Sequence, residues 1–193
     1  MNRNLLAVFF LLVVAACNPA PVAFQNTDLT GATFARQFSL RDHNGQTRSL
    51  ADFSGKVVVI FFGYTACPDI CPTMLSSLAG VMTALGPQAE KVQVLFVSLD
   101  PERDSAERLK DFVPWFHPSF IGLRGDAAQT RAVAEEFRVF SARREVGSQL
   151  GYLLDHSAGA YVYDPAGRLR LYVRDGAHAE EIAADIRLLL AGR

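Results

Sequence analysis

The chain has 193 residues, and its 19 lysines and arginines nearly balance 20 aspartates and glutamates, which leaves a formal net charge of -1. This near-neutral charge, without a basic cluster, argues against nucleic acid as a partner. Half of the residues are hydrophobic, and the length suits one domain with a sizeable core.

The N-terminus has the pattern of a secretory signal. One basic residue, Arg3, precedes an unbroken apolar run over residues 5–16. This run is shorter than the roughly 20 apolar residues that a membrane-spanning helix needs, and Pro19 and Pro21 prevent its helical continuation. The sequence therefore predicts a signal peptide over residues 1–16, with cleavage after Ala16.

The residues around the cleavage point, Val14-Ala15-Ala16-Cys17, resemble the bacterial lipobox, in which the cysteine is lipidated and becomes the new N-terminus. The alternative is an ordinary secreted chain with a spare thiol at Cys17, which is a liability in an oxidising compartment. We therefore expect a lipoprotein of the bacterial cell envelope, anchored to the membrane and facing the periplasm or the exterior. Residues 17–33 then comprise the lipidated cysteine and a flexible tether.

The folded domain is expected over residues 34–193, beginning near Phe34. Short strands at Phe38–Leu40 and Thr47–Leu50 flank an Asn-Gly pair, which predicts a hairpin. The remaining predicted strands are 57–62, 92–98, 120–123, 160–163 and 169–173, and the predicted helices are 72–85, 105–116, 127–137 and 179–190.

This order of elements predicts the fold class. Strands alternate with helices, and an antiparallel hairpin and a terminal helix follow, which indicates an α/β fold with a mixed central sheet flanked by helices. A thioredoxin-like fold fits the order, with the N-terminal hairpin as an extension that covers one edge of the sheet.

Two closely spaced cysteines, Cys67 and Cys71, lie between the buried strand 57–62 and the helix 72–85. Proline is tolerated in the first turn of a helix, so Pro72 places Cys71 at or just before the helix N-terminus. The positive end of the helix dipole is expected to stabilise a thiolate there and to lower the pKa of the cysteine.

This cysteine pair has three interpretations: a structural disulfide, a redox dithiol and a metal site. A disulfide across so short a loop removes little entropy from the unfolded chain. Thioredoxin-like redox motifs have two residues between the cysteines, whereas three lie between Cys67 and Cys71. Soft thiolates favour Cu(I), zinc or iron–sulfur clusters, but two cysteines are too few for a four-ligand site, so a metal would need a ligand from elsewhere.

His156 is the best candidate for that ligand, since it lies immediately before the predicted strand 160–163. In a thioredoxin-like fold the loop before this strand packs against the cysteine turn. The other histidines have ordinary explanations: His43 lies in the hairpin turn, His117 at a helix end and His178 near the start of the last helix. Two thiolates and one imidazole can hold copper as Cu(I) or Cu(II).

Three segments resemble, in the same order, the motifs of the Sco/SenC family: Cys67-Pro68-Asp69-Ile70-Cys71-Pro72, residues 98–104 and Asp155-His156-Ser157. The resemblance covers about residues 38–190. It implies a thioredoxin-like copper protein, anchored outside the cytoplasmic membrane, that assists assembly of the CuA centre of cytochrome c oxidase. It matches Cys67, Cys71 and His156 to the ligands of one copper ion per chain, and it implies an oxidase subunit as the partner that receives the copper.

Two details of the resemblance stay open. Asp100 and Asp104 match an acidic segment of the family, but they also read as a loop turn and as a cap of the following helix. Many family members are held by a transmembrane helix, so the apparent lipobox at Cys17 departs from that pattern in the mode of anchoring.

Two functions from different classes use the same cysteines. The first is a copper metallochaperone, and the second is a thiol-disulfide oxidoreductase that keeps the cysteines of the oxidase copper site reduced. A periplasmic copper carrier or a thiol reductant would be a further partner. Thioredoxin-type enzymes carry a cis-proline before the strand that starts at Ala160, but no proline lies in residues 141–163, which favours metal binding. A peroxiredoxin-type peroxidase is disfavoured because Tyr64 stands where its threonine would be.

Overall fold

The computed structural model describes residues 23–147 and 151–193. The strands are β1 Thr27–Asp28, β2 Leu40–Asp42, β3 Thr47–Arg48, β4 Val57–Gly63, β5 Val92–Ser98, β6 Ile121–Arg124, β7 Ser141–Glu145, β8 Tyr152–His156, β9 Ala160–Tyr163 and β10 Leu169–Val173. The helices are α1 Ile70–Leu85, α2 Ala106–Phe116, α3 Ala127–Glu136 and α4 Ala179–Leu190, with short 3-10 turns η1 Leu50–Phe53 and η2 Gly86–Lys91.

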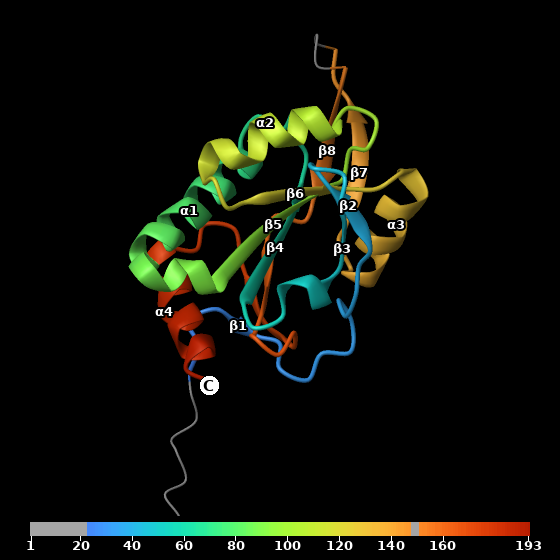
Figure 1. Ribbon diagram of the computed structural model, residues 1–193. Helices are drawn as coiled ribbons and strands as arrows, with labels where there is room; N and C mark the ends of the chain where they lie inside the picture. The colour runs from blue at the N-terminus through green and yellow to red at the C-terminus, as the bar shows by residue number, and fades with distance from the viewer. Residues whose placement is uncertain (1–22, 148–150) are drawn as a thin grey trace, which may run out of the picture.

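Eight of the strands form one mixed sheet in the order β1-β10-β9-β4-β5-β6-β2-β3 (Figure 1). The central strands β4, β5 and β6 are parallel, and β9 joins the other side of β4 in the antiparallel direction. The expected α/β class and the thioredoxin-like arrangement are confirmed. The β2–β3 hairpin lies at one edge of the sheet, as predicted.

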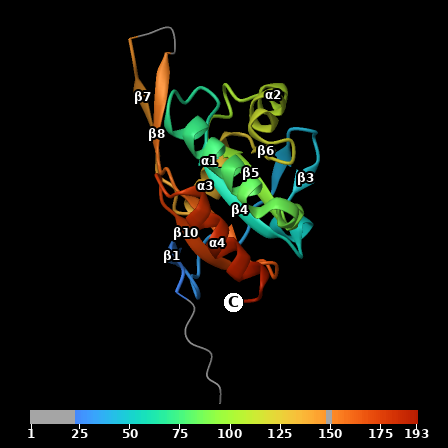
Figure 2. The same cartoon turned by 90° about the vertical axis from the view of Figure 1, so that its left-hand side faces the viewer.

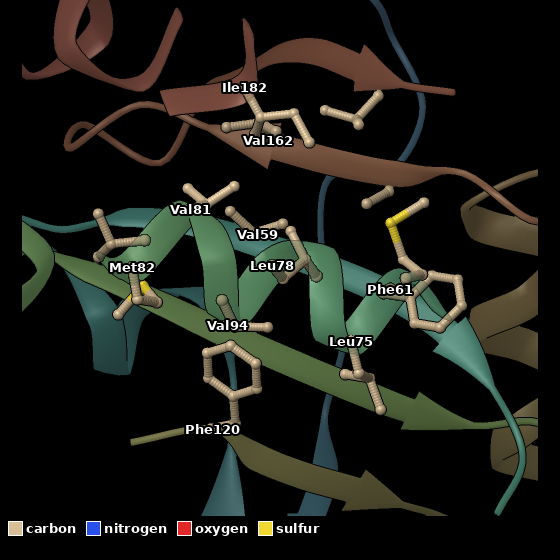
Figure 3. Close-up of a cluster of buried hydrophobic side chains, with 14 of the residues drawn as sticks. Val59, Phe61, Leu75, Leu78, Val81, Met82, Val94, Phe120, Val162 and Ile182 are labelled. Atoms are coloured by element: carbon tan, nitrogen blue, oxygen red, sulfur yellow. The ribbon is translucent and has the colours of Figure 1, made fainter. Parts of the chain in front are cut away.

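The sheet is covered on both faces because its central strands are apolar throughout. All seven residues of β4 are buried, and alternate side chains point to opposite faces. Val59 and Phe61 pack with α1, α2 and α4 on one face (Figure 3), whereas Ile60 and Phe62 pack with α3 on the other. Two cores therefore fix the strand that leads into the cysteines.

Helix α1, together with η2, is long and apolar enough to cross a membrane by length and composition, and it is the single such helix in the described ranges. Its apolar side chains, including Leu75 and Leu78, lie in the core against β4 and α4 (Figure 3). The composition of this segment is thus accounted for by burial inside the domain.

A long hairpin formed by β7 and β8 was not predicted from the sequence, which indicated a loop there. Its strands form a separate two-stranded sheet, which stands away from the rest of the domain (Figure 2). Strand β7 is mostly exposed and has the sequence Ser-Ala-Arg-Arg-Glu. It therefore lacks the alternation of apolar residues by which strands are recognised.

The N-terminal part of the domain begins earlier than the expected boundary near Phe34. Strand β1 pairs with β10, and the backbone amides of Gln25 and Asn26 each donate to the buried carboxylate of Asp185, both at 2.9 Å. The last part of the predicted tether, from Gln25 onward, is thus attached to the folded domain. The predicted signal peptide and Cys17 lie outside the described residues.

Candidate metal centre

The two cysteines are positioned by the junction of β4 with α1. Strand β4 ends at Gly63, Cys67 lies in the connecting loop, and α1 begins at Ile70. Cys71 is therefore inside the first helical turn, not at or before the helix N-terminus as expected. The difference arises because a proline fits anywhere in the first turn, where its missing N–H has no partner to lose, so Pro72 did not mark the first helical residue.

His156 is the last residue of β8, and the hairpin brings it to the cysteine turn. The Cys71 Sγ and His156 Nε2 atoms are 3.4 Å apart. One donor atom each from Cys67, Cys71 and His156 lies within 4.8 Å of the others. The three residues singled out in the sequence are thus brought together, although Cys71 and His156 are 85 positions apart.

The orientation of the His156 ring leaves one nitrogen for a metal. Nδ1 is 2.9 Å from the backbone carbonyl oxygen of Ser157. Because a carbonyl oxygen can only accept, Nδ1 carries the proton, and in the neutral ring the lone pair of Nε2 points toward the sulfurs. A hydrogen bond from the ring nitrogen that does not bind the metal is the usual way in which a protein orients a histidine ligand.

The two cysteine side chains have opposite acidities. Hydrogen bonding from the Cys71 thiol, and then from the amides of Asp69 and Cys71, lowers the pKa of Cys67 to about 3. The hydrogen bond to Cys67, burial and the nearby negative charge raise the pKa of Cys71 far above its ordinary value. The centre at neutral pH is therefore a thiolate at Cys67 beside a thiol at Cys71.

This assignment corrects the expectation that the helix N-terminus would activate Cys71. The amide of Cys71 points back to the Cys67 Sγ atom at 3.4 Å, so the free N–H groups at the start of α1 act on the sulfur of the preceding loop. Cys71 itself is completely buried, whereas Cys67 is partly exposed. An incoming ion or thiol thus meets Cys67 first.

Two glycines allow close packing, and the first of them, Gly63, does so at the metal centre. A methyl group built on Gly63 would lie 2.6 Å from the Cys71 Sγ atom and 2.9 Å from the ring of Phe96. A methyl group on Gly159, three residues after His156, would collide with the ring of Tyr172. Both glycines escaped notice in the sequence, although Gly63 is the one residue without a side chain in the strand that leads to the cysteines.

A pocket of about 260 Å³ opens beside the three donor atoms. Its wall combines the cysteine loop with the hairpin, and its lining residues include Tyr64, Cys67, Arg144, Asp155 and His156. Arg144 and Asp155 form an exposed ion pair with an N–O distance of 3.2 Å. Ligand exchange at the centre thus has an open approach from the side of Cys67 and His156.

Asp104 is hydrogen-bonded to the cysteine loop and does not cap α2. The cap is Ser105, whose side chain accepts from the Arg108 amide. The Asp104 carboxylate accepts hydrogen bonds from the hydroxyls of Thr65 and Ser98, both at 2.6 Å. Burial raises the pKa of Asp104 despite these bonds. The helix-cap interpretation of Asp104 was therefore wrong, because its carboxylate is used by Thr65 and Ser98 and the cap is Ser105. Through these two hydrogen bonds Asp104 holds the cysteine loop in place.

The other histidines lie away from this centre. His43 Nδ1 accepts from the Gly122 amide at 3.1 Å, His117 contacts Ser119, and His178 precedes the first turn of α4. Their ordinary structural roles agree with the sequence interpretation.

Comparison with known proteins supports a single family. A family model described as SCO1/SenC matches residues 26–191. The mitochondrial SCO2 homolog of Bos taurus is 38% identical over 156 residues, which are 80% of this chain and 59% of that protein. An SCO2-like protein of Rickettsia felis is 37% identical over 132 residues, 68% of this chain and 64% of the relative. The chain therefore spans about three fifths of the length of these curated relatives.

Solved structures give the same result. A structure of Bradyrhizobium japonicum ScoI with copper bound has a TM-score of 0.73 and 38% identity, covering 80% of this chain and 98% of that one. The apo Sco1 protein of Thermus thermophilus has a TM-score of 0.77 and 38% identity, covering 89% of this chain and 99% of its own. The family resemblance seen in the sequence motifs is thus confirmed over the whole domain.

Proposed function

Because the chain belongs to the SCO1/SenC family, we propose that it is a copper metallochaperone that assists assembly of the CuA centre of cytochrome c oxidase. One copper ion per chain would be held by Cys67, Cys71 and His156. The observation that carries this proposal is the meeting of two sulfurs and one imidazole nitrogen within 4.8 Å, beside an open pocket.

The donor set fits copper in both oxidation states. Thiolate sulfur suits Cu(I), and the imidazole suits Cu(I) and Cu(II). Cys67 is already a thiolate, and the Cys71 thiol would lose its proton when it binds the ion, since coordination deprotonates a thiol outright. The related ScoI of Bradyrhizobium japonicum, at 38% identity, has been solved with copper bound.

Exposure of the donors suggests how copper would leave. Cys67 and His156 line the pocket, whereas Cys71 is buried beneath them. An acceptor thiolate or imidazole from the receiving oxidase subunit can therefore replace the outer donors first. Release from Cys71 would follow as that sulfur takes up a proton again, which its raised pKa favours.

Metal titration of the reduced mature chain tests this function. We expect one equivalent of Cu(I), and one of Cu(II) with a sulfur-to-copper charge-transfer absorption, and transfer of the ion to an apo CuA domain. Absence of stoichiometric binding by either ion would refute the metallochaperone.

A second candidate, a thiol-disulfide oxidoreductase, is favoured by the low pKa of Cys67. The Cys67 thiolate would attack a partner disulfide, and Cys71 would then attack Cys67 Sγ. The partner leaves with two thiols, the chain keeps a disulfide, and a thiol reductant must restore it. Rapid reduction of the oxidised CuA cysteines by a chain that binds no copper would select this function.

We also propose that Cys17 carries a lipid anchor and that the domain faces the periplasm or the exterior. Strand β1, where the described chain starts, lies at the opposite end of the molecule from the β7–β8 hairpin (Figures 1 and 2). An anchor there would direct the metal centre away from the membrane. Acyl chains on Cys17 in mass spectrometry, and release of Cys17→Ser from the membrane fraction, are expected, and an unmodified Cys17 thiol would refute the anchor.

A further inference from the structure

Outside its own ladder, the hairpin that carries His156 is oriented by side-chain contacts, in which Leu154 packs against both hydrophobic cores. In the part of the chain that the structure describes, β7 and β8 form ladder hydrogen bonds only with each other. At the His156 end, the amide of Ser157 donates to the Phe140 carbonyl at 3.1 Å. Tyr152 lies at the other end of β8, about 13 Å along the strand at the usual rise per residue. A change of tilt at Tyr152 would therefore move His156.

Tyr152 is held on its hydroxyl and on both sides of its ring. It is 8% exposed, and its hydroxyl donates to Asp100 Oδ1 at 2.7 Å. The guanidinium carbon of Arg103 lies 3.6 Å from the ring centroid, and that of Arg143 lies 3.7 Å from it. Two guanidinium groups at such distances must occupy opposite faces of one ring. Each is placed for a cation–π interaction with the ring.

The arginine from the body of the domain is itself fixed. Arg103 forms an ion pair with the buried carboxylate of Asp100, and its Nη1 atom donates to the Tyr152 carbonyl oxygen at 2.8 Å. The other arginine, Arg143, belongs to β7, so both strands of the hairpin are held against the loop that follows β5. We call Asp100, Arg103, Tyr152 and Arg143 the hairpin clamp.

The clamp continues to the metal centre through Tyr64. The Arg103 guanidinium lies 5.6 Å from the Tyr64 ring centroid. The same ring meets the imidazole of His156 edge-on, with centroids 5.8 Å apart and an interplanar angle of 82°. Tyr64 is buried, so the imidazole has a rigid wall on this side. A line of stacked groups thus runs from the clamp to the histidine.

We propose that Tyr152 is a positioning residue for His156, acting through the hairpin clamp, and that it sets how well the centre holds Cu(II). This inference rests on the proposed copper function. Cu(II) requires the nitrogen donor in a defined place, whereas Cu(I) tolerates two-sulfur coordination. Displacement of β8 therefore weakens Cu(II) binding more than Cu(I) binding.

The test compares Tyr152→Phe and Tyr152→Leu with matched variants of Tyr163. The Tyr163 hydroxyl is also buried and donates to the Ala35 carbonyl at 2.6 Å, but it lies in the core cluster on the α3 face of the sheet, away from the hairpin. Tyr163→Phe and Tyr163→Leu therefore reproduce the loss of a hydroxyl or of a buried ring without touching the clamp.

For Tyr152→Leu we expect a fall in Cu(II) affinity of about 10-fold or more, the scale at which outer groups act on metal ligands, and a weaker charge-transfer band. Cu(I) binding should change less, and Tyr152→Phe, which keeps the stacked ring, should retain most of the Cu(II) affinity. Parental Cu(II) affinity and spectrum in Tyr152→Leu would overturn the proposal, as would equal losses in Tyr163→Leu.

A second measurement on the metal-free chain separates this proposal from the copper function. NMR reports the environment of the His156 ring directly. Tyr152→Leu should shift the His156 ring signals, and Tyr163→Leu should not, even if the parent chain binds no copper. If the His156 signals do not change in Tyr152→Leu, Tyr152 does not position His156, whatever the metal titration shows.

Discussion

The sulfur donors and the nitrogen donor of the candidate metal centre come from regions that are built differently. Cys67 and Cys71 follow β4, a strand buried on both faces by two cores, and a supporting carboxylate lies beneath their loop. His156 ends a two-stranded hairpin that is tied to the domain by Leu154, which packs against both cores, and by polar and stacking contacts at Tyr152.

This difference indicates a division of roles. Apolar burial is non-directional and summed over many residues, so the sulfurs stay in place when a single contact is lost. A few polar and cation–π contacts are directional and individually modest, so the position of the imidazole responds to single changes. We therefore expect the dithiol to be the robust part of the centre and Cu(II) selectivity to be the sensitive part.

The largest effect should come from removing a sulfur. Cys67→Ser and Cys71→Ser each replace a soft donor by a poor one, so Cu(I) affinity should fall by more than the roughly 10–100-fold seen on loss of outer groups. Oxidation to the Cys67–Cys71 disulfide should abolish binding, and reduction should restore it. Competition with a Cu(I) chelator measures each change, and equal uptake by the oxidised and reduced chains would contradict this view.

The second effect concerns the pH at which the Cys67 thiol becomes reactive, which should be far lower than for an ordinary cysteine. With a pKa of about 3, Cys67 should be alkylated at a nearly constant rate from about pH 5 to pH 8, whereas an ordinary cysteine reacts faster as its thiolate forms near pH 8.5. The rate of iodoacetamide labelling against pH checks this. A midpoint near pH 8.5 would show that the two sulfurs do not share the Cys71 proton.

The same shifts set how stability depends on pH. The folded pKa of Cys67 is depressed, so its contribution to the free energy of unfolding is fully present above its ordinary value and is lost as the pH falls through about 3. The folded pKa of Cys71 is raised, so its contribution is present below its ordinary value and is lost as the pH rises above it. Denaturant unfolding of the parent, Cys67→Ser and Cys71→Ser from about pH 3 to about pH 10 measures both contributions.

The third prediction concerns the hairpin side of the centre. His156→Ala should lose the Cu(II) charge-transfer absorption, or reduce the ion quickly, while Cu(I) stays on the two sulfurs more weakly. His178→Ala, in which the altered side chain makes no cap hydrogen bond, is the control. An unchanged Cu(II) spectrum in His156→Ala would remove this residue from the ligand set.

A smaller effect is expected from filling the space beneath Cys71. Gly63→Ala places a methyl group 2.6 Å from the Cys71 sulfur, so the sulfur or the Phe96 ring must shift, at a cost of about 1–3 kcal/mol in stability. Weaker Cu(I) and Cu(II) binding should accompany this loss. Gly80→Ala, in the middle of α1, meets only Ala179 at 3.3 Å and should leave copper binding unchanged. Chemical denaturation and metal competition measure both variants.

The smallest effect on copper affinity should follow from a substitution of Asp185, which lies in α4, away from the metal centre. Asp185 is 1% exposed and accepts three hydrogen bonds from Gln25 and Asn26, so Asp185→Asn should destabilise the fold by about 1–3 kcal/mol. Because α4 does not touch the metal ligands directly, copper affinity should stay at the parental value. A clear loss of affinity would show that the two ends of the domain are coupled.

Much of the sheet could be predicted because its signals are local. Unbroken apolar runs gave β5 with both boundaries correct and β4 to within one residue, and helical spacing gave α4. The chemistry of the centre could also be proposed, since two cysteines with too few partners require a further donor and His156 precedes a central strand. The order of motifs then identified the family.

The sequence by itself thus determined the sheet, the family and the three candidate donors, since apolar periodicity and residue spacing report directly on burial and on chemistry. Only the tertiary structure decided the parts that depend on contacts between distant segments. The exposed strand β7 forms because it pairs with β8, and Asp100 and Arg103 hold the hairpin at Tyr152. Cys67 is the thiolate because the first amides of α1 and the Cys71 thiol point at its sulfur. Asp104 supports the cysteine loop because the fold brings Thr65 and Ser98 to its carboxylate. Such directional contacts leave no periodic pattern along a chain, so they can be read only after it has folded.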